Sequence, residues 1–374
     1  MSRPPPAIVL VDYNGLDDTR RCLASLAGLA GAARVVVVDN ASRVDVATAL
    51  SSTFPWATFL RAGRNGGWAG GNNLGLKFAL AGGADLVILL NNDTVVGPDF
   101  ACRMVAAADA HPEFGVLGPV IRFLAPPHEV QTDGVVFNGP ARPGFFQRLA
   151  VPLPPAAPGT APGAAQGEPT GDPPGVAEVD IVNGCCLMVR RAVVERVGLI
   201  DEAYFLVHEE SDFCLRAQEA GFRNGVIAES LVWHKGSSSF QREGKRLQRY
   251  FDARNLVRLL RRHRGRPTAR GPYSSGRHYL RYAYHRYCIE RDGGFRDSAD
   301  AVLEGLYDAL TGRWGPHTTR RRPGLTLLRL AFGSAWRVAG GHAPGPASGP
   351  VPGPAAGPVP PAPDSARLRH ARPG

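Results

Sequence analysis

A short apolar segment that ends abruptly in polar residues places the strongest constraint on the fold. Residues 86–90 read Leu-Val-Ile-Leu-Leu, and Asn91, Asn92 and Asp93 follow directly. A strand covered on both faces needs no polar alternation, so this run predicts a buried strand of an α/β sheet. Ligands of such sheets bind at the carboxyl ends of the strands, where the Asp93 carboxylate can hold a divalent cation or a ligand hydroxyl. A plain turn is the alternative, because Asn and Asp are common turn residues.

The segment from residue 7 to about residue 118 alternates strands with helices. We predict strands at residues 8–11, 34–38, 58–61 and 86–90, and helices at residues 19–29 and 72–81. This alternation implies βαβ units and a mostly parallel sheet. The strand at 34–38 ends in Asp39, and a parallel sheet would bring Asp39 and Asp93 to the same edge. A carboxylate pair of this kind suits the hydroxyls and the metal-bound phosphates of a nucleoside diphosphate.

The composition is that of a globular protein with a basic surface. The 374 residues are 44% hydrophobic and 20% charged, with a formal charge of +10. The charge fits a polyanionic partner, an anionic membrane surface or a phosphate-bearing ligand without choosing among them. Six cysteines without a Cys-x-x-Cys pair argue against a zinc site or a disulfide framework. No segment reads as a signal peptide or as the roughly 18 apolar residues of a membrane span, so we expect a cytoplasmic protein.

Composition also divides the chain into three parts. Residues 1–240 carry the strand and helix pattern and form one predicted domain, interrupted at 151–178 by a Pro-, Ala- and Gly-rich stretch that predicts a flexible loop. Residues 241–339 are basic and predict a helical C-terminal region. Residues 340–374 are rich in Pro, Gly and Ala and predict a disordered tail.

A glycine-rich segment lies between the two acidic strand ends. Residues 65–75 read Asn-Gly-Gly-Trp-Ala-Gly-Gly-Asn-Asn-Leu-Gly. The glycines would let backbone amides approach a ligand closely and would lead into a helix N-terminus. The segment lacks the Gly-x-Gly-x-x-Gly spacing of dinucleotide sites and the Lys-Ser/Thr ending of a P-loop. The alternative is a flexible surface turn.

Three carboxylates crowd the start of a helix predicted at residues 209–220. Glu209, Glu210 and Asp212 fall within one turn, so their repulsion should raise at least one pKa and prepare a carboxylate to take a proton. Asp212 can pair with Arg216 four residues later, which leaves the two glutamates as candidates. The alternative is a solvated acidic face at a helix start.

Together these segments resemble the inverting family 2 glycosyltransferases of the nucleotide-diphospho-sugar transferase (GT-A) fold, and within them the bacterial rhamnosyltransferase-like members. The resemblance covers residues 7–239 and rests on residues 37–42, 65–75, 89–93, 183–186, 201–202, 209–212 and 234. It implies a mostly parallel central sheet flanked by helices. It also implies transfer of a sugar from a nucleoside-diphosphate donor to an acceptor hydroxyl with inversion at the anomeric carbon.

The resemblance assigns roles to individual positions. It places the nucleotide sugar against Asn14, Asp39, Asn65, Gly66, Gly67, Gly70, Asn73, Asn92 and Asp93. It places a Mg or Mn ion on Asp93, with Asn91 where the family's Asp-x-Asp motif has its first acid and with His234 as a further ligand. Glu210 would be the catalytic base, with Glu209 as the alternative. The acceptor would lie near Asn183, Gly184 and Asp212.

The same resemblance suggests substrates. Rhamnose from a dTDP donor is the first guess, ahead of UDP and GDP sugars, and the acceptor would be a cell-envelope glycan, a lipid-linked saccharide or a secondary metabolite. Residues 325–337 carry an amphipathic pattern with Leu325, Leu328, Phe332, Trp336 and Arg329. This pattern predicts either a helix at the inner face of the cell membrane or a helix packed on the domain. The sequence does not predict the oligomeric state.

Two other functions compete with this interpretation. A sugar-phosphate nucleotidyltransferase would carry a Gly-rich signature with Arg and Lys after the first strand, where this chain has Asp-Tyr-Asn-Gly at residues 12–15. A nucleic-acid-binding protein would explain the basic residues 246–266 with Tyr250 and Phe251 among them. It would leave the acidic strand ends unexplained, so we expect no nucleic-acid partner.

Overall fold

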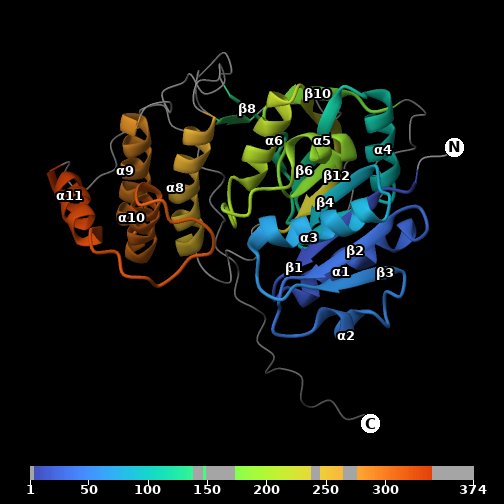
Figure 1. Cartoon of the computed structure of the whole chain (residues 1–374), viewed down its shortest axis with the longest axis horizontal. Coiled ribbons are helices and arrows are strands. Elements are labelled where there is room, and N and C mark those ends of the chain that lie inside the picture. Colours follow the sequence, from blue (N-terminus) through green and yellow to red (C-terminus); the bar gives the residue numbers. More distant parts are fainter. Residues whose placement is uncertain (1–3, 138–145, 149–172, 237–244, 264–275, 339–374) are drawn as a thin grey trace, which may run out of the picture.

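The protein consists of a mixed sheet covered by helices on both faces, followed by a group of C-terminal helices that stand to one side of it (Figure 1). The computed structural model describes residues 4–137, 146–148, 173–236, 245–263 and 276–338. The predicted tail at 340–374 and residues 151–172 of the predicted loop lie outside the described residues. The remaining part of that loop differs from the prediction, because residues 176–178 already belong to a strand.

The main sheet has the strand order β10-β12-β6-β11-β4-β1-β2-β3. These strands are β1 (Ala7–Asp12), β2 (Arg34–Asp39), β3 (Ala57–Arg61), β4 (Leu86–Asn91), β6 (Phe114–Phe123), β10 (Val176–Val179), β11 (Cys186–Arg190) and β12 (Arg223–His234). Two short strands extend it, since β5 (Thr94–Val96) pairs with β12 and β7 (Val130–Thr132) with β6. A separate ladder joins β8 (Val135–Phe137) to β9 (Phe146–Arg148).

The α/β sheet flanked by helices was predicted correctly, and its direction changes where the strand and helix alternation ends. Strands β4, β1, β2 and β3 run parallel to one another. Beyond them, β11 runs antiparallel between β4 and β6, while β6 and β12 are parallel. The parallel half is the part of the chain that the alternating pattern covered.

Two apolar layers explain why the central strands need no polar alternation. Ile8 and Leu10 of β1 pack with α1 (Leu16–Leu26), α2 (Val46–Leu50) and α4 (Phe100–Ala110) on one face. Ala7 and Val9 pack on the other face with α3 (Gly67–Ala81), α5 (Arg191–Val197) and α6 (Glu209–Glu219). A short 3₁₀ turn, η1 (Ala27–Leu29), follows α1. Burial on both faces is the arrangement expected for such apolar runs.

The glycine-rich segment forms the beginning of α3. This helix starts at Gly67, five residues before the predicted start, so most of the segment is helical. A Cβ on Gly71 would lie 2.6 Å from Cγ1 of Val11, and one on Gly75 would lie 2.3 Å from Cγ1 of Val9. These two glycines therefore allow α3 to pack closely on β1, a role that the prediction of a ligand-binding loop did not include.

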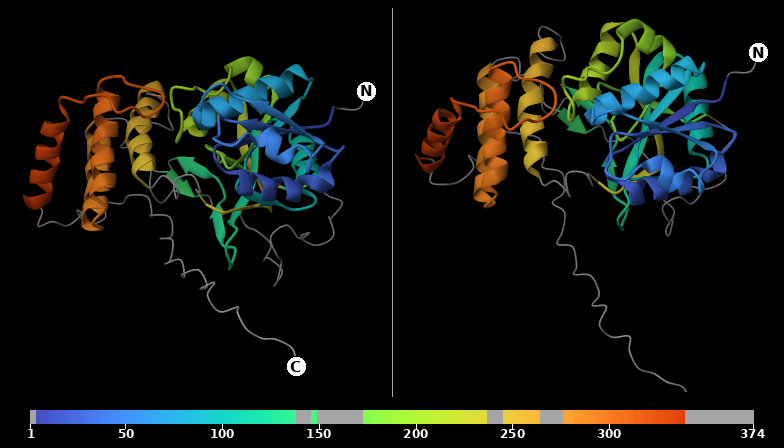
Figure 2. Two further views of the ribbon diagram at one scale, coloured as in Figure 1. Left: turned by 90° about the horizontal axis from the view of Figure 1, so that it is seen from below. Right: turned by 60° about the horizontal axis from the view of Figure 1, so that its bottom comes forward.

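The described residues of the C-terminal region include the helices α8 (Lys245–Arg262), α9 (Gly276–Asp292), α10 (Arg296–Leu310) and α11 (Leu325–Val338). Helix α8 lies nearest the sheet and α11 farthest from it in each view (Figure 2). Leu325, Leu328, Phe332 and Trp336 of α11 pack into the core of this region. The packed helix was the alternative to a membrane-facing stripe, and for these four residues it is the one observed. Within the described ranges, no helix combines the length and the apolar character needed to cross a membrane.

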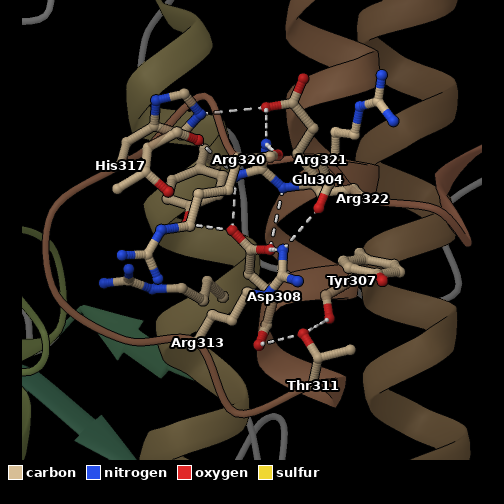
Figure 3. A network of polar contacts seen from close by, with 12 residues as sticks. Glu304, Tyr307, Asp308, Thr311, Arg313, His317, Arg320, Arg321 and Arg322 are labelled. Carbon is tan, nitrogen blue, oxygen red and sulfur yellow. Dashed lines mark hydrogen bonds and ion pairs between the residues drawn. The ribbon is translucent and has the colours of Figure 1, made fainter.

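A polar network fastens the segment after α10 to the helices. Asp308 accepts a hydrogen bond from the hydroxyl of Tyr250 at 2.7 Å. It also accepts one from Nη2 of Arg322 at 2.6 Å (Figure 3). Glu304, one turn earlier, accepts from Nε2 of His317 at 3.2 Å. These carboxylates are buried, so their contacts with Arg322 and His317 hold residues 313–322 in one place.

Candidate active site

A cavity of about 190 Å³ lies at the carboxyl ends of β1 and β4. The register pairs Asp12 with Asp39 and Val11 with Asn91, so these strand ends share one edge of the sheet, as predicted. Among the described residues, five amide side chains line the cavity, namely those of Asn40, Asn65, Asn72, Asn91 and Asn92. Amides offer both donors and acceptors, which suits a ligand with hydroxyls, a base and phosphates.

Asp93 and His234 meet at this cavity. Nε2 of His234 is 3.0 Å from Oδ1 of Asp93, and both side chains are less than a tenth exposed. The other ring nitrogen lies 2.9 Å from Oε1 of Gln131. Burial disfavours the charged imidazole, but Cys185 and Asp93 raise the pKa of His234 well above its usual value. The sequence placed both residues in the metal site, and the structure brings them together.

The residues around Asp93 fit a cation that is held mainly by its substrate. Across the described ranges there is no cluster of three or more His, Cys, Asp or Glu side chains arranged for a metal. Asn91 keeps its side-chain oxygen occupied, since Oδ1 accepts a hydrogen bond from Nε1 of Trp68 at 3.0 Å. Mg²⁺ is commonly bound by one or two carboxylates together with substrate phosphates and water. Asp93 supplies one such carboxylate, and His234 could add a ligand only as a neutral imidazole with one ring nitrogen released from Asp93 or Gln131.

A network of amides shapes the cavity beside α3. Nδ2 of Asn40 donates to Oδ1 of Asn65 at 3.1 Å and to the carbonyl of Gly67 at 3.0 Å. Gly66 donates its N–H to Oδ1 of Asn40 at 3.0 Å, and Gly67 donates to Oδ1 of Asn65 at 2.8 Å. The predicted residues Asn65, Gly66 and Gly67 therefore lie at the site, where their mutual hydrogen bonds fix the turn into α3.

Two other residues that were predicted to bind the nucleotide sugar, Asp39 and Asn14, form hydrogen bonds within the protein. Asp39 accepts the N–H of Ser42 at 2.7 Å and is paired with Arg61, so its carboxylate stabilises the turn after β2. Asn14 accepts the N–H of Arg43 at 2.9 Å with its side-chain oxygen. Neither residue is among those that line the cavity.

Asn73 connects α3 to the segment before α6. Its Nδ2 donates to the carbonyl of Ile200 at 2.9 Å and to Oε1 of Glu202 at 3.0 Å. Gly70 lies beside the same carboxylate, since a Cβ there would be 3.7 Å from Glu202. The prediction placed Asn73 in the donor pocket, whereas Asn72 is the residue that lines it.

Asn92 lies at the cavity and also ties two elements together. Its Nδ2 donates to the hydroxyl of Thr19 at 2.8 Å and to Oδ2 of Asp12 at 3.3 Å. Asp12 is fully buried and accepts two hydroxyl hydrogen bonds as well, from Thr19 at 2.6 Å and from Ser42 at 2.7 Å. These contacts hold the ends of β1 and β4 in a fixed relation.

The two candidate bases differ in their surroundings. Glu209 is buried, and its Oε2 has no hydrogen-bond partner in the described part of the chain. Burial, followed by the charge of Glu210, raises the pKa of Glu209 well above the usual glutamate range. Glu210 is less buried and sits at the first turn of α6. A Cβ on Gly184 would lie 3.4 Å from both Glu210 and Trp68, so Glu210 stands close to a residue of the cavity wall.

The residues that were predicted to lie near the acceptor, Asn183, Gly184 and Asp212, have different surroundings. Oδ1 of Asn183 accepts the N–H of Cys185 at 2.8 Å and closes the turn that contains Gly184. Asp212 is fully buried, and its partners include Arg216 at 2.8 Å and His263 at 3.0 Å. Although burial opposes it, the hydrogen bond with His263 and the charge of Arg216 lower the pKa of Asp212. The structure therefore places Asp212 in the contact between α6 and the end of α8.

Sequence reasoning missed the apolar part of the cavity wall. The apolar and aromatic residues that line it include Tyr13, Trp68, Phe205, Leu206, Leu247 and Phe251. Phe251 comes from α8 and stacks on Phe205, with ring centroids 5.4 Å apart. The only signal in the sequence was the aromatic pair at 250–251, which suggested nucleic-acid binding. Helix α8 thus forms part of the site.

Comparison with known proteins identifies the class. The model of "Glycosyl transferase family 2" matches residues 7–163, and that of "Glycosyl transferase family group 2" matches residues 176–292. The matched segments include the strand ends, α6 and α8, and they define the protein as a glycosyltransferase. Within that class, the chain belongs to the family 2 glycosyltransferases, which decides between the enzyme classes that the sequence left open.

Named relatives agree with this assignment. The chain is 24% identical over 255 residues to the low-salt glycan biosynthesis hexosyltransferase Agl10 of Haloferax volcanii, covering 67% of this chain and 73% of that protein. It is 28% identical over 250 residues to the N-acetylglucosaminyl-diphospho-decaprenol L-rhamnosyltransferase of Mycobacterium tuberculosis, covering 63% and 78%. Among solved structures, the mannosyltransferase PcManGT of Pyrobaculum calidifontis, in complex with GDP-Man and Mn2+, superposes with a TM-score of 0.50 at 17% identity, covering 90% of this chain and 81% of that one. That likeness supports the GT-A fold.

Proposed function

We propose that this glycosyltransferase moves a sugar from a nucleoside-diphosphate donor to an acceptor hydroxyl with inversion at the anomeric carbon. One observation carries the proposal: the amide-lined cavity that contains Asp93 adjoins, through Trp68 and Gly184, the start of α6 where Glu210 stands. The acceptor oxygen forms the new bond to the anomeric carbon, the bond from that carbon to the diphosphate breaks, and the acceptor proton passes to a carboxylate.

Glu210 is the proposed base. It is the less buried of the two glutamates, whereas burial keeps Glu209 protonated over a wider pH range and therefore less able to accept a proton. A general base within reach of its proton typically contributes about 10²- to 10⁴-fold to the rate. Glu210→Gln retains the shape of the side chain and removes the base. Wild-type transfer by this variant would exclude the assignment.

Asp93 and His234 are the proposed ligands of a Mg or Mn ion. When bound, such an ion would offset the negative charge that develops on the departing diphosphate. The protein contributes the orientation: Asn40, Asn65 and Asn72 face the cavity and can bind the donor's polar groups. Trp68 and Tyr13 supply aromatic surface for its base or sugar.

A donor screen tests this function directly. A ligand that binds only the folded protein raises its melting temperature, so dTDP-, UDP- and GDP-sugars are compared with and without Mn²⁺ or Mg²⁺. We expect the largest stabilisation from dTDP-rhamnose with metal, and a smaller one for Asp93→Asn. Phe78→Ser, a change at an exposed position outside the cavity, is the control. No stabilisation by any nucleotide would contradict the proposed function.

The proposed acceptor is a lipid-linked saccharide. The Mycobacterium tuberculosis relative is named for transfer to a diphospho-decaprenol-linked sugar. A basic protein can approach the anionic cytoplasmic face of a membrane where such an acceptor resides. Helix α11 presents Leu327 and Leu330 to solvent, 72% and 59% exposed, beside the arginines of the C-terminal region. These two leucines, rather than the packed stripe, are the proposed membrane contact.

Vesicle flotation tests that contact. The protein is mixed with vesicles that contain anionic lipid. The double variant Leu327→Glu, Leu330→Glu is expected to reduce the bound fraction severalfold, because each change would bury a charge in the membrane instead of an apolar side chain. Leu280→Glu, at an exposed position on α9, is the matched control. Equal flotation of the wild type, the double variant and Leu280→Glu would contradict a role for α11 in membrane contact.

A further inference from the structure

A strained backbone segment precedes the helix that carries Glu210. Phe205, Val207 and His208 have φ angles of 64°, 71° and 71°. Non-glycine residues rarely adopt this left-handed region, and a β-branched residue such as Val207 is the least suited to it. Such a backbone conformation is energetically unfavourable and persists only where the surrounding structure enforces it. Contacts from the surrounding structure must therefore hold residues 203–208 in this conformation.

Asn255 of α8 contacts three carbonyls of this segment. Its Nδ2 lies 2.9 Å from the carbonyl oxygen of Tyr204, and 2.7 Å from those of Leu206 and Val207. The amide group is oriented by Arg254, whose Nε donates to Oδ1 of Asn255 at 2.8 Å. An amide nitrogen has two hydrogens, so at least one of them is shared between two carbonyls. Asn255 is fully buried, and water cannot replace these contacts.

Arg254 holds the beginning of the same segment. Its Nη2 donates to the carbonyls of Tyr204 at 2.8 Å and Ala203 at 3.3 Å, and its Nη1 donates to Gly315. The N–H of Gly315 in turn donates to the carbonyl of Ala203 at 2.8 Å. Because Arg322 binds Asp308 in the network of Figure 3, the segment that supplies Gly315 is itself fixed.

The strained segment connects three parts of the site. Phe205 and Leu206 line the cavity. The carbonyl of Phe205 accepts the N–H of Ala69 in the first turn of α3 at 3.4 Å, and a Cβ on Gly67 would clash with that same carbonyl. The carbonyl of His208 accepts the N–H of Asp212, which begins the hydrogen bonding of α6. The backbone of residues 205–208 therefore sets where α6 starts.

We propose that Arg254 and Asn255 are positioning residues for sugar transfer: from α8 they hold residues 203–208 in the conformation that places the start of α6, with Glu210, against the cavity. The inference rests on the proposed function of Glu210. It assigns to the C-terminal helices a part in the reaction itself, since α8 carries both residues and also supplies Phe251 to the cavity wall. Neither Arg254 nor Asn255 lines the cavity, and each acts through the backbone that it holds.

Two substitutions at Asn255 test the proposal. Asn255→Ala removes the donors, and Asn255→Asp keeps the shape but turns an acceptor toward three carbonyl oxygens. We expect the kcat of transfer to fall about ten- to a hundredfold, because small displacements of a catalytic group have effects of this size. The Asp variant should lose more than the Ala variant. Nucleoside-diphosphate affinity should change less than about threefold, because the amide side of the cavity is unchanged.

The control is Arg249→Ala on the same helix. Arg249 pairs with the buried carboxylate of Glu290 on α9, so this variant also loses stability without touching residues 203–208. It should keep its kcat below its melting temperature. A loss of kcat equal to that of Asn255→Ala at matched stability would show a general stability effect and would overturn the proposal. Arg254→Lys, which keeps the charge but not the guanidinium fork, should lose part of the rate.

Hydrogen exchange separates this inference from the proposed function. Peptides that span residues 203–212 should exchange faster in Asn255→Ala than in the wild type and in Arg249→Ala. Unchanged exchange in these peptides would overturn the positioning role. If the wild type transferred no sugar from any donor, the proposed function would fail, while faster exchange would still support the hold of α8 on the segment.

Discussion

His208 and Asp252 face each other between the strained segment and α8, with Nε2 of the imidazole 3.1 Å from Oδ1 of the carboxylate. Each side chain is 15% exposed. The hydroxyl of Tyr282 donates to the other carboxylate oxygen at 2.7 Å, and Arg286 lies 4.0 Å from it. A third contact thus joins the segment before α6 to the helix that carries Arg254 and Asn255.

This pair should make stability depend on pH. Burial works against the charged forms, but the hydrogen bond between them raises the pKa of His208 and, with Arg286, lowers the pKa of Asp252. Glu210 is the other charge that acts on His208. The contribution of His208 is complete below the ordinary histidine pKa and is lost as the pH rises through the raised value. The contribution of Asp252 is lost only as the pH falls through its lowered value.

His208→Gln is therefore expected to destabilise the protein mainly near neutral and mildly acidic pH. A hydrogen bond to a charged group contributes about 1.5–3 kcal/mol, so a difference of this order should appear at about pH 6 and shrink by about pH 9. Urea unfolding of both proteins at the two pH values measures it. A difference that stays constant with pH would contradict the charged pair.

Glu209 should make stability change with pH in the opposite way from Asp252. Because burial raises the pKa of Glu209, the folded state keeps a proton that the unfolded state releases. Stability is then lost as the pH rises above the ordinary glutamate range toward the raised value. Glu209→Gln removes this dependence, and each pKa unit corresponds to about 1.4 kcal/mol. We expect the variant to gain stability over the wild type between about pH 5 and about pH 8 in thermal unfolding.

The same substitutions distinguish the two glutamates in catalysis. Glu209→Gln should retain most transfer activity, whereas Glu210→Gln should lose about 10²- to 10⁴-fold if Glu210 takes the proton. Initial rates at saturating donor, with melting curves for both proteins, make the comparison. Equal losses would indicate that the glutamates act together, and a larger loss for Glu209→Gln would reverse their roles.

The parts of the fold that the sequence predicted are those governed by local pattern. The runs at 35–38 and 86–90 are buried strands because both of their faces meet apolar layers, and parallel pairing then brings their ends together. The start of α3 was missed because glycine favours turns in isolation, and Gly71 suits the helix only because it packs on Val11 of β1.

The sequence did not predict two kinds of site residue. Some differ from a neighbour only by one step along a helix, and others come from a segment far along the chain from the strand ends. Asn72 and Asn73 are chemically identical, but one helical step turns one toward the cavity and the other toward Ile200. Phe251 reaches the cavity through a contact between α8 and the segment before α6. No periodicity of the sequence encodes that contact. Asp212 was assigned by motif, and its burial against His263 depends on the position of α8.

The glycines of α3 offer a direct test of close helix packing. Gly71→Ala and Gly75→Ala would each place a methyl within 2.6 Å of a valine of β1, and overpacking of this kind costs about 1–3 kcal/mol. Gly70→Ala is the matched control, because its nearest neighbour would be 3.7 Å away. An alanine there should stabilise the helix by about 0.5–1 kcal/mol. Denaturant unfolding of the three variants checks the order, and equal effects would argue against packing as the reason for these glycines.

Asn91→Asp tests whether the missing carboxylate limits metal binding. The new carboxylate can still accept the hydrogen bond that Trp68 donates to Asn91, so the local structure should be retained. It would add a negative charge to a cavity that already contains Asp93, and we expect apparent Mn²⁺ affinity in the presence of nucleoside diphosphate to rise at least about tenfold. Without metal, repulsion between the two carboxylates should lower the melting temperature. Titration of Mn²⁺ by calorimetry measures the first effect, and unchanged affinity would show that Asp93 and the diphosphate already satisfy the ion.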